Sequence, residues 1–454
     1  MQADLFYTVD STRPVPLYFM SPKQWEEQRP TLTAVEHNYF EQMQFNGTLG
    51  DCCLFYNADG LLEKAYIGTG DDNQVLAMAH AAELLPVNTY QVQDTCTQEA
   101  VLYWALAQYR FEKYKKNSTA PRILVVEPQM LDEVLQLAQT HFLVRDLINE
   151  PASDLGPKEM ADAVATLAHT YNAKFEQWIG NELLHDNFPA IHAVGRAAQS
   201  EPRLLSLTWG NEENPRIALV GKGVCYDTGG LNIKSAYGMR IMKKDMGGAA
   251  HVIGLAQWIM AHNLPIHLHL LIPAVENAIG PNAYRPGDIL VMRNGLTVEL
   301  DNTDAEGRLI LADALVKACE GQPDLLIDFA TLTSSARVSV GTEMSAFFTN
   351  NEALATGIID ASHKAVDPVW RLPLFTPYEK FLRSSIADMT NCSDHPYAGA
   401  IIASLFLQRY ITKTTPWIHF DIMAWSEQSK PGKPEGGEVM GLRAVMEYLL
   451  RVYG

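Results

Sequence analysis

Beyond residue 200, continuous apolar runs alternate with segments of helical periodicity, and this alternation constrains the fold more than any other feature of the chain. Apolar runs at 216–221, 266–275, 295–300 and 324–330 alternate with helical segments at 246–263 and 308–321. Strands buried on both faces give such runs, and intervening helices favour parallel pairing. We therefore predict an α/β fold with a mostly parallel central sheet flanked by helices. In such sheets, ligands bind outside the carboxyl ends of the strands.

The first part of the chain has shorter apolar runs between helical segments. Helices are predicted at 75–85 and 99–114, followed by a polar connector at 115–122. We place a domain boundary near residue 125. This gives a smaller α/β domain over 1–125 and a catalytic domain over 126–454, with a linker helix at about 131–148.

Composition and charge exclude several classes of protein. The net charge of −18 disfavours broad binding to nucleic acid, because an acidic surface repels phosphates. No apolar stretch reaches the ~20 residues of a membrane span, and the N-terminus lacks the features of a secretory signal. Six cysteines in 454 residues are too sparse for a disulfide scaffold, which favours a reducing cytoplasm.

Polar clusters interrupt the pattern at three predicted strand ends. Their acidic members come from separated segments and would converge at one edge of the sheet. Carboxylates held close together must be protonated or neutralised, and two divalent cations would balance four of them. The alternative is that each acid is a helix cap or a turn residue. The four carboxylates are Asp227, Asp245, Asp304 and Glu306.

Two lysines and an arginine accompany these acids. Lys222 ends a strongly apolar strand, where an unpaired charge would be costly. It either binds a metal as a neutral amine or pairs with a nearby carboxylate. Lys234 follows a Gly-Gly turn and could polarise a carbonyl oxygen or hold an oxyanion. Arg308 lies two residues after Glu306.

Five stretches, in this order, resemble the M17 leucyl aminopeptidase family: GKGVCYDTGGLNIK, KKDMGGAA, ENAIGPNAYRPGDI, NTDAEGRLILADAL and DFATLT. The resemblance covers about 144–454, and the octapeptide at 302–309 is its most specific part. It implies a metal-dependent aminopeptidase that hydrolyses the N-terminal bond of short peptides with two divalent ions. It also implies a macro-like N-terminal domain, a homohexamer and a cytoplasmic location.

The same resemblance assigns roles to residues. The implied metal ligands are Lys222, Asp227, Asp245, Asp304 and Glu306, with Mn²⁺ or Zn²⁺ bound and Mg²⁺ or Co²⁺ also possible. Lys234 and Arg308 are the implied catalytic pair, with a bicarbonate ion held at Arg308 as general base. Arg308 cannot be that base itself, because guanidinium stays protonated in proteins. The chemistry is coherent, since two metal ions activate water and polarise a carbonyl.

The pocket for the first side chain of the substrate departs from the usual pattern of the family. Ser334 stands where the family has glycine, and Met423 where it has a small residue. Our hypothesis is that these two residues reshape the pocket, so that leucine need not be the preferred residue. The residues expected to contact substrate are Met242, Asn302, Thr331, Leu332, Ser334 and Met423.

Some alternatives and weaker signals remain open. The main alternative function is a family member that binds DNA or acts as a scaffold; a further one is a two-metal hydrolase of another amide or a phosphoester. His267 and His269 lie on one strand face as zinc ligands sometimes do, but no third ligand is near in sequence. We interpret them as structural, together with Cys225 and the Cys52–Cys53 pair. Residues 394–396 are predicted to be a surface loop.

Overall fold

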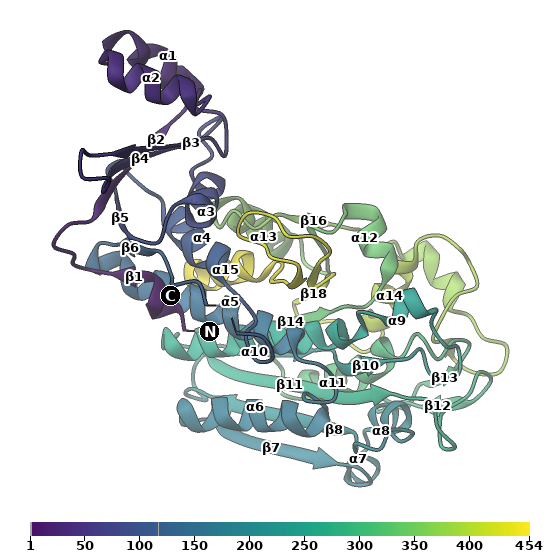
Figure 1. Ribbon diagram of the computed structural model, residues 1–454. Helices are drawn as coiled ribbons and strands as arrows, with labels where there is room; N and C mark the ends of the chain where they lie inside the picture. Colours follow the sequence, from purple (N-terminus) through teal and green to yellow (C-terminus); the bar gives the residue numbers. More distant parts are fainter. Residues whose placement is uncertain (1, 117) are drawn as a thin grey trace. The chain divides into compact units, whose positions relative to one another are not determined.

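The computed structural model describes residues 2–116 and 118–454 (Figure 1). Contacts divide the chain into two units. The first is the chain up to Phe142 together with Glu427–Glu435, and the second is Leu143–Ser426 with Gly436–Gly454. Helix α5, Pro128–Asn149, therefore contributes to both units. In the described ranges, no helix is both long enough and apolar enough to cross a membrane.

The first unit is built on a six-stranded sheet in the order β1-β6-β5-β2-β4-β3. All of its pairs are parallel except β3 with β4. A small α/β domain was predicted at the N-terminal end, and this mostly parallel sheet is of the kind that such a domain contains. The strands are Tyr7–Thr8 (β1), Val15–Met20 (β2), Cys52–Tyr56 (β3), Leu62–Gly68 (β4), Thr89–Val92 (β5) and Ile123–Val125 (β6).

Helices α3 and α4 form the core of this unit with the sheet. The predicted helix at 99–114 is shorter in the structure and ends at Gln108. Tyr109 is extended there, and Arg110 Nη1 donates to the carbonyl of Ala107 at 3.1 Å, so the arginine caps the end instead of continuing the helix. The helices are Ala3–Phe6 (η1), Pro22–Gln28 (α1), Arg29–Thr31 (η2), Ala34–Gln42 (α2), Gln74–Leu84 (α3) and Gln98–Gln108 (α4).

A nine-stranded sheet organises the second unit, in the order β16-β15-β18-β14-β9-β11-β8-β7, with β10 paired to β11. The central pairs are parallel, and antiparallel pairs join β7, β8 and β15 to it. The predicted, mostly parallel sheet is confirmed. Its strands are Lys174–Ile179 (β7), Arg203–Trp209 (β8), Arg216–Gly221 (β9), Gly223–Asp227 (β10), His267–Asn277 (β11), Leu325–Ala330 (β14), Ser345–Thr349 (β15), Val369–Arg371 (β16) and Trp417–Asp421 (β18).

Helices α10 and α11 pack on opposite faces of this sheet. Ala218 and Val220 of β9 belong to one core cluster with α11, whereas a Cβ at Gly221 would meet Val252 of α10. Side chains alternate between faces along a strand, so the two helices enclose β9. The helices are Pro157–Thr170 (α6), Glu182–His185 (α7), Pro189–Gly195 (α8), Ala236–Met239 (α9), Met242–Met246 (η3), Gly247–Ala261 (α10), Gly307–Glu320 (α11), Ser334–Val340 (α12), Glu352–Lys364 (α13), Thr376–Leu382 (η4), Gly399–Gln408 (α14) and Leu442–Tyr453 (α15).

The apolar run at 295–300 differs from the expectation. It forms β13, which pairs with β12 and β17 in a separate three-stranded sheet and not with the central strands. Only Val298 of its three residues is buried, so the segment suits a small sheet with one covered face. The short strands are Ile289–Val291 (β12), Thr297–Glu299 (β13), Met389–Thr390 (β17), Trp425–Ser426 (β19) and Gly436–Gly437 (β20).

Several polar residues lie at the carboxyl ends of neighbouring central strands. Lys222 follows β9, Asp227 ends β10, and Thr331 follows β14. Strand β9 pairs with both β14 and β11, and β10 pairs with β11, so these ends lie at one edge of the sheet. This is the edge at which sheets of this kind bind ligands.

Candidate active site

Three buried carboxylates meet at this edge. Asp227, Asp245 and Glu306 each direct an oxygen into a group whose atoms all lie within 4.8 Å of one another. They come from the end of β10, from the turn η3 before α10, and from the loop before α11. Asp304 lies beside them with its side chain 33% exposed. The structure thus brings together the four acids that the sequence singled out.

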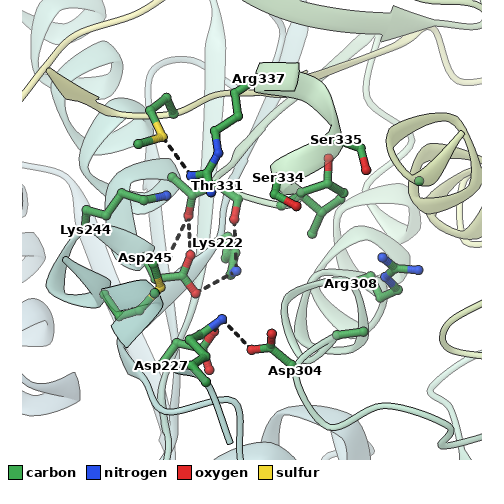
Figure 2. A pocket seen from close by; sticks show the side chains of 18 of the residues that line it. Lys222, Asp227, Lys244, Asp245, Asp304, Arg308, Thr331, Ser334, Ser335 and Arg337 are labelled. Carbon is green, nitrogen blue, oxygen red and sulfur yellow. Dashed lines mark hydrogen bonds and ion pairs between the residues drawn. The ribbon is translucent and has the colours of Figure 1, made fainter. Parts of the chain in front are cut away.

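Two lysine ammonium groups lie among these acids. Lys222 Nζ is 2.7 Å from Asp245 Oδ2 and 2.9 Å from Glu306 Oε1, and it donates to the carbonyl of Thr331 at 3.1 Å (Figure 2). Lys234 Nζ lies 2.9 Å from Asp227 Oδ2 and also pairs with Asp304. Lys222 Nζ thus lies among the same carboxylates that are the candidate metal ligands.

Burial and mutual repulsion shift the acids of the cluster in different directions. Burial, followed by the charge of Asp227, raises the pKa of Glu306 to about 8. Burial and the charge of Asp245 raise the pKa of Asp227 to about 6. Burial also opposes the charged form of Asp245, but Lys222 and neighbouring lysines outweigh it and lower its pKa. Ionising all of these buried carboxylates therefore costs free energy, and positive charge nearby lowers that cost.

A close approach of backbone to side chain positions Lys222. A Cβ on Gly307, the first residue of α11, would lie 2.5 Å from Lys222 Cε and 2.8 Å from its Nζ. No side chain larger than hydrogen fits there without moving the lysine. The Asp227 carboxylate is held as well, because its Oδ1 accepts hydrogen bonds from the backbone of Gly229 and from Asn277 Nδ2, each at 2.8 Å.

The donor set fits divalent cations. Glu306 Oε2 is buried and accepts no hydrogen bond from any residue that the structure describes. Asp245 Oδ2 likewise has no hydrogen bond of good geometry, although it lies 2.7 Å from Lys222 Nζ. Buried carboxylate oxygens without donors are costly, and hard cations are the partners that suit them. Carboxylates with an amine form a ligand set that Mn²⁺ and Zn²⁺ accept.

Arg308 is the second residue of α11 and is buried, with 8% of its surface exposed. Its Nη1 donates to the carbonyl of Asn391 at 2.7 Å, whereas its Nε has no hydrogen-bond partner within the described chain. A guanidinium with a free donor fits a small planar anion. Within residues 2–116 and 118–454 it forms no ion pair with a carboxylate, so it stands apart from the lysine–acid network.

A cavity of about 470 Å³ opens above the cluster. Every residue that the sequence analysis assigned to substrate contact lines it: Met242, Asn302, Thr331, Leu332, Ser334 and Met423. The same cavity is lined by the metal-ligand candidates except Glu306, which is buried outside the lining, and by both members of the catalytic pair.

Sequence reasoning missed several contributors. The Thr331 hydroxyl donates to Asp245 Oδ1 at 2.7 Å, so a residue expected at the substrate also orients a candidate ligand. Asn277 joins Asp227 to the Thr303 carbonyl, and its place at the end of a strand was the available signal. Lys244 and Arg337 also line the cavity, and neither drew attention as a site residue.

The features interpreted as structural have structural surroundings. His269 contacts the Ser206 hydroxyl at 3.1 Å, and neither it nor His267 joins a cluster of candidate metal ligands within the described ranges. Burial raises the pKa of the Cys225 thiol well above its ordinary value. Burial also raises the pKa of Cys52 to about 11, which makes it unreactive. Residues 394–396 lie in a loop.

The site combines buried lysine–carboxylate pairs at the carboxyl edge of a mostly parallel sheet with carboxylate oxygens that have no donor. A cavity opens above them. This arrangement is that of a metallohydrolase. Comparison with known proteins specifies which one. Residues 142–446 match the model of the cytosol aminopeptidase family, catalytic domain, and residues 15–127 match that of the M17 aminopeptidase N-terminal domain. The chain belongs to the M17 cytosol aminopeptidase family.

Individual relatives agree. The "Probable cytosol aminopeptidase" of Clostridium perfringens is 38% identical over 363 residues, which cover 76% of this chain and 73% of the relative. The crystal structure of cytosol aminopeptidase from Coxiella burnetii matches with a TM-score of 0.96 and 44% identity, over 99% of this chain and 100% of that one. The bottromycin maturation enzyme BotP, solved in complex with Mn, matches with a TM-score of 0.87 and 31% identity, over 97% and 100%.

The expected family and activity are therefore confirmed. The protein is a metal-dependent aminopeptidase, a metallo-exopeptidase that acts on the N-terminal bond of peptides. The comparisons give no support to the alternative of a DNA-binding or scaffold protein.

Proposed function

We propose that two divalent ions, Mn²⁺ or Zn²⁺, bind at the buried cluster, with Mg²⁺ or Co²⁺ as possible substitutes. The proposed ligands are Lys222, Asp227, Asp245, Asp304 and Glu306. The observation that carries this proposal is the convergence of three acidic side chains within 4.8 Å, with Glu306 Oε2 buried and without a hydrogen bond. Bound divalent ions would supply Lewis acidity, which lowers the pKa of water and polarises a carbonyl.

Lys234 is the proposed electrophilic residue. Burial opposes its charge, but Asp227 and the other acids raise its pKa well above the ordinary value, so it stays an ammonium. An ammonium at the cavity wall can donate to the carbonyl oxygen of the substrate as negative charge develops there. A preorganised donor of this kind stabilises the tetrahedral oxyanion.

Arg308 is the proposed holder of a bicarbonate ion. Its unpartnered Nε supports this role, because a guanidinium binds a carbonate-class anion through two donors. Proton transfer from water to the leaving amine needs a base with a pKa near neutrality, and Arg308 cannot be that base. Its contribution is to bind and orient the anion.

The substrate is proposed to contact Met242, Asn302, Thr331, Leu332, Ser334 and Met423. The larger Ser334 and Met423 would reshape the space for the first side chain, since discrimination of a single methylene is worth about 1–3 kcal/mol. A panel of aminoacyl amides tests this hypothesis. A strong preference for Leu over Ala and Met would contradict it.

Metal analysis combined with kinetics tests the metal proposal. Chelator-stripped protein should regain amidase activity with Mn²⁺, Zn²⁺ or Co²⁺ and bind two ions per chain by elemental analysis. A Glu306→Ala variant should lose both properties. The exposed Glu213, which lies in the loop before β9, gives a control variant, Glu213→Gln, that should keep them. Full activity of Glu306→Ala with two bound ions would refute the proposal.

We also propose that the enzyme works in the cytoplasm as a homohexamer and that the chain functions as two domains, 1–125 and 126–454. The relatives named cytosol aminopeptidase support the location, and the family resemblance supports the assembly. Sedimentation should give six times the chain mass of 50.5 kDa. A monomeric mass at assay concentration would contradict the assembly.

A further inference from the structure

Lys244 is a buried lysine that lies outside the lysine–acid network described above. It directly precedes Asp245, lines the cavity, and is 5% exposed. It has no ion pair among residues 2–116 and 118–454. Burying an ammonium group without a counter-charge costs free energy, and the described residues around Lys244 form no ion pair that would offset this cost.

Arg337, on α12, lines the same cavity and is partly buried. Its Nη1 donates to Met423 Sδ at 3.2 Å, and the described part of the chain offers it no carboxylate. A thioether sulfur is a weak acceptor, so this contact leaves the guanidinium able to bind a stronger one. Figure 2 shows the heads of Lys244 and Arg337 directed toward the same space beside Thr331.

The nearest acids are already engaged by other groups. Asp245 is paired with Lys222 and accepts the Thr331 hydroxyl. Asp421 accepts the backbone N–H groups of Leu332 and Thr333, each at 3.0 Å, and the Thr333 hydroxyl at 2.6 Å. Two basic side chains therefore face the cavity, and neither forms an ion pair with a carboxylate of the residues that the structure describes.

The position of the two cations indicates which part of a substrate they meet. An aminopeptidase substrate places its α-amine and scissile carbonyl at the carboxylate cluster, and the rest of the peptide leads out to solvent. Lys244 adjoins the cluster itself, and Thr331 and the buried Met423 lie beside the two cations. This side of the cavity suits the first side chain of the substrate.

We propose that this enzyme prefers peptides with an N-terminal aspartate or glutamate, whose side-chain carboxylate is bound by Lys244 and Arg337. The proposal rests on the proposed function, because it takes the α-amine to be held at the carboxylate cluster. Hydrogen bonds between a carboxylate and ammonium or guanidinium groups are the strong, charge-assisted kind. Ser334 and Met423 then border a polar pocket, and an apolar leucine side chain leaves both cations without a partner.

Aminoacyl amides test the proposal, because they carry no C-terminal carboxylate that could bind the same cations. The comparison that isolates charge is glutamate against glutamine amide and aspartate against asparagine amide, with leucine amide as the apolar reference. With the metal-loaded wild-type enzyme, kcat/KM for the acidic member of each pair should be about tenfold to a hundredfold higher, as charge-assisted hydrogen bonds allow. Equal or higher kcat/KM for glutamine or leucine amide would overturn the proposal.

Variants assign the preference to its residues. Lys244→Met removes the charge and keeps most of the side-chain length, and Arg337→Gln removes the charge from a partly buried position. The melting temperature of each variant shows whether it folds. Each should lower the Glu/Gln ratio of kcat/KM about tenfold or more, mainly through KM. Arg240→Gln is the matched control, because Arg240 is an exposed cation close in sequence but outside the cavity lining. A ratio unchanged in both cavity variants, or lowered equally in the control, would overturn the assignment.

The outcomes separate this proposal from the one on which it rests. Hydrolysis of leucine amide without a preference for acidic amides would leave the aminopeptidase mechanism standing and remove the acidic pocket. A dipeptide arm, leucyl-glutamate against leucyl-glutamine, tests whether the cations bind the residue after the scissile bond instead. A charge preference confined to that arm would also overturn the proposal. No hydrolysis of any amide by folded, metal-loaded enzyme would contradict the proposed function itself.

Discussion

Replacement of Gly307 by alanine sets two opposite effects against each other. Alanine is the better helix former by about 0.5–1 kcal/mol, so helix propensity alone predicts a more stable protein. The added Cβ, however, would lie 2.5 Å from Lys222 Cε. Carbon atoms prefer about 3.5–4.0 Å, so the lysine must move by about 1 Å.

Such a movement would break the contacts that hold Lys222. Its ammonium lies 2.7 Å and 2.9 Å from two carboxylate oxygens and 3.1 Å from a carbonyl oxygen, and about 1 Å more puts these atoms beyond hydrogen-bonding distance. Breaking a buried ion pair costs about 3–5 kcal/mol. The loss exceeds the helix gain, and we expect Gly307→Ala to be less stable by about 2–4 kcal/mol. A misplacement of 1 Å in an active site costs about a hundredfold in rate.

Urea unfolding and amide hydrolysis measure the two effects in the same protein. Gly321→Ala, just beyond the other end of α11, is the matched control because its nearest neighbour would be the Ala318 carbonyl at 3.4 Å, an ordinary contact. The control should keep wild-type kcat/KM and stability within about 0.5 kcal/mol, as is usual at such sites. If Gly307→Ala behaved like this control, the close packing of Lys222 on α11 would not be what positions the lysine.

Three further results are expected. Thr331→Val removes the donor to Asp245 Oδ1 and should weaken Mn²⁺ binding about 10- to 100-fold in a titration; unchanged affinity would contradict its orienting role. Asp328→Asn should cost about 3–5 kcal/mol in urea unfolding, because Asp328 is buried between Trp417 Nε1 at 2.7 Å and His419 Nδ1 at 2.6 Å. Burial opposes the charge of His419 but Asp328 raises its pKa, so its stabilising contribution should be complete below about pH 6.5, fade as pH rises through the folded pKa, and vanish in this variant. Chelator-treated protein should stay folded, and Mn²⁺ should raise its melting temperature.

The parts of the fold that depend on local periodicity could be predicted from the sequence. Continuous apolar runs identified β9, β11 and β14 and their parallel arrangement, because strands enclosed by α10 and α11 have no exposed face. Pairing partners are not encoded so locally. The run that forms β13 is short and alternates apolar with polar residues, and it pairs with β17, about 90 positions away, in another sheet.

The candidate site divides in the same way. The four carboxylates could be identified from the sequence, because several acids at the ends of predicted strands repel one another unless a cation neutralises them. The contributions of Asn277 and of the Thr331 hydroxyl were not visible, since a hydrogen bond between distant segments leaves no spacing in the sequence. Nothing in the sequence distinguishes Lys244 from the adjacent Lys243, and its burial at the cavity is known only from the structure.

The expectation that the chelated enzyme stays folded follows from the arrangement of its charges. Every carboxylate of the cluster lies against an ammonium group: Lys222 pairs with Asp245 and Glu306, and Lys234 pairs with the other two. Two lysines neutralise half of the negative charge, and the large core of the second unit does not depend on the site. Divalent ions then add stability by mass action, about 2.7 kcal/mol at a hundred times their dissociation constant. Unfolding on chelation would mean that these ion pairs are too weak to hold the acids together, and that the site is a structural centre as well as a catalytic one.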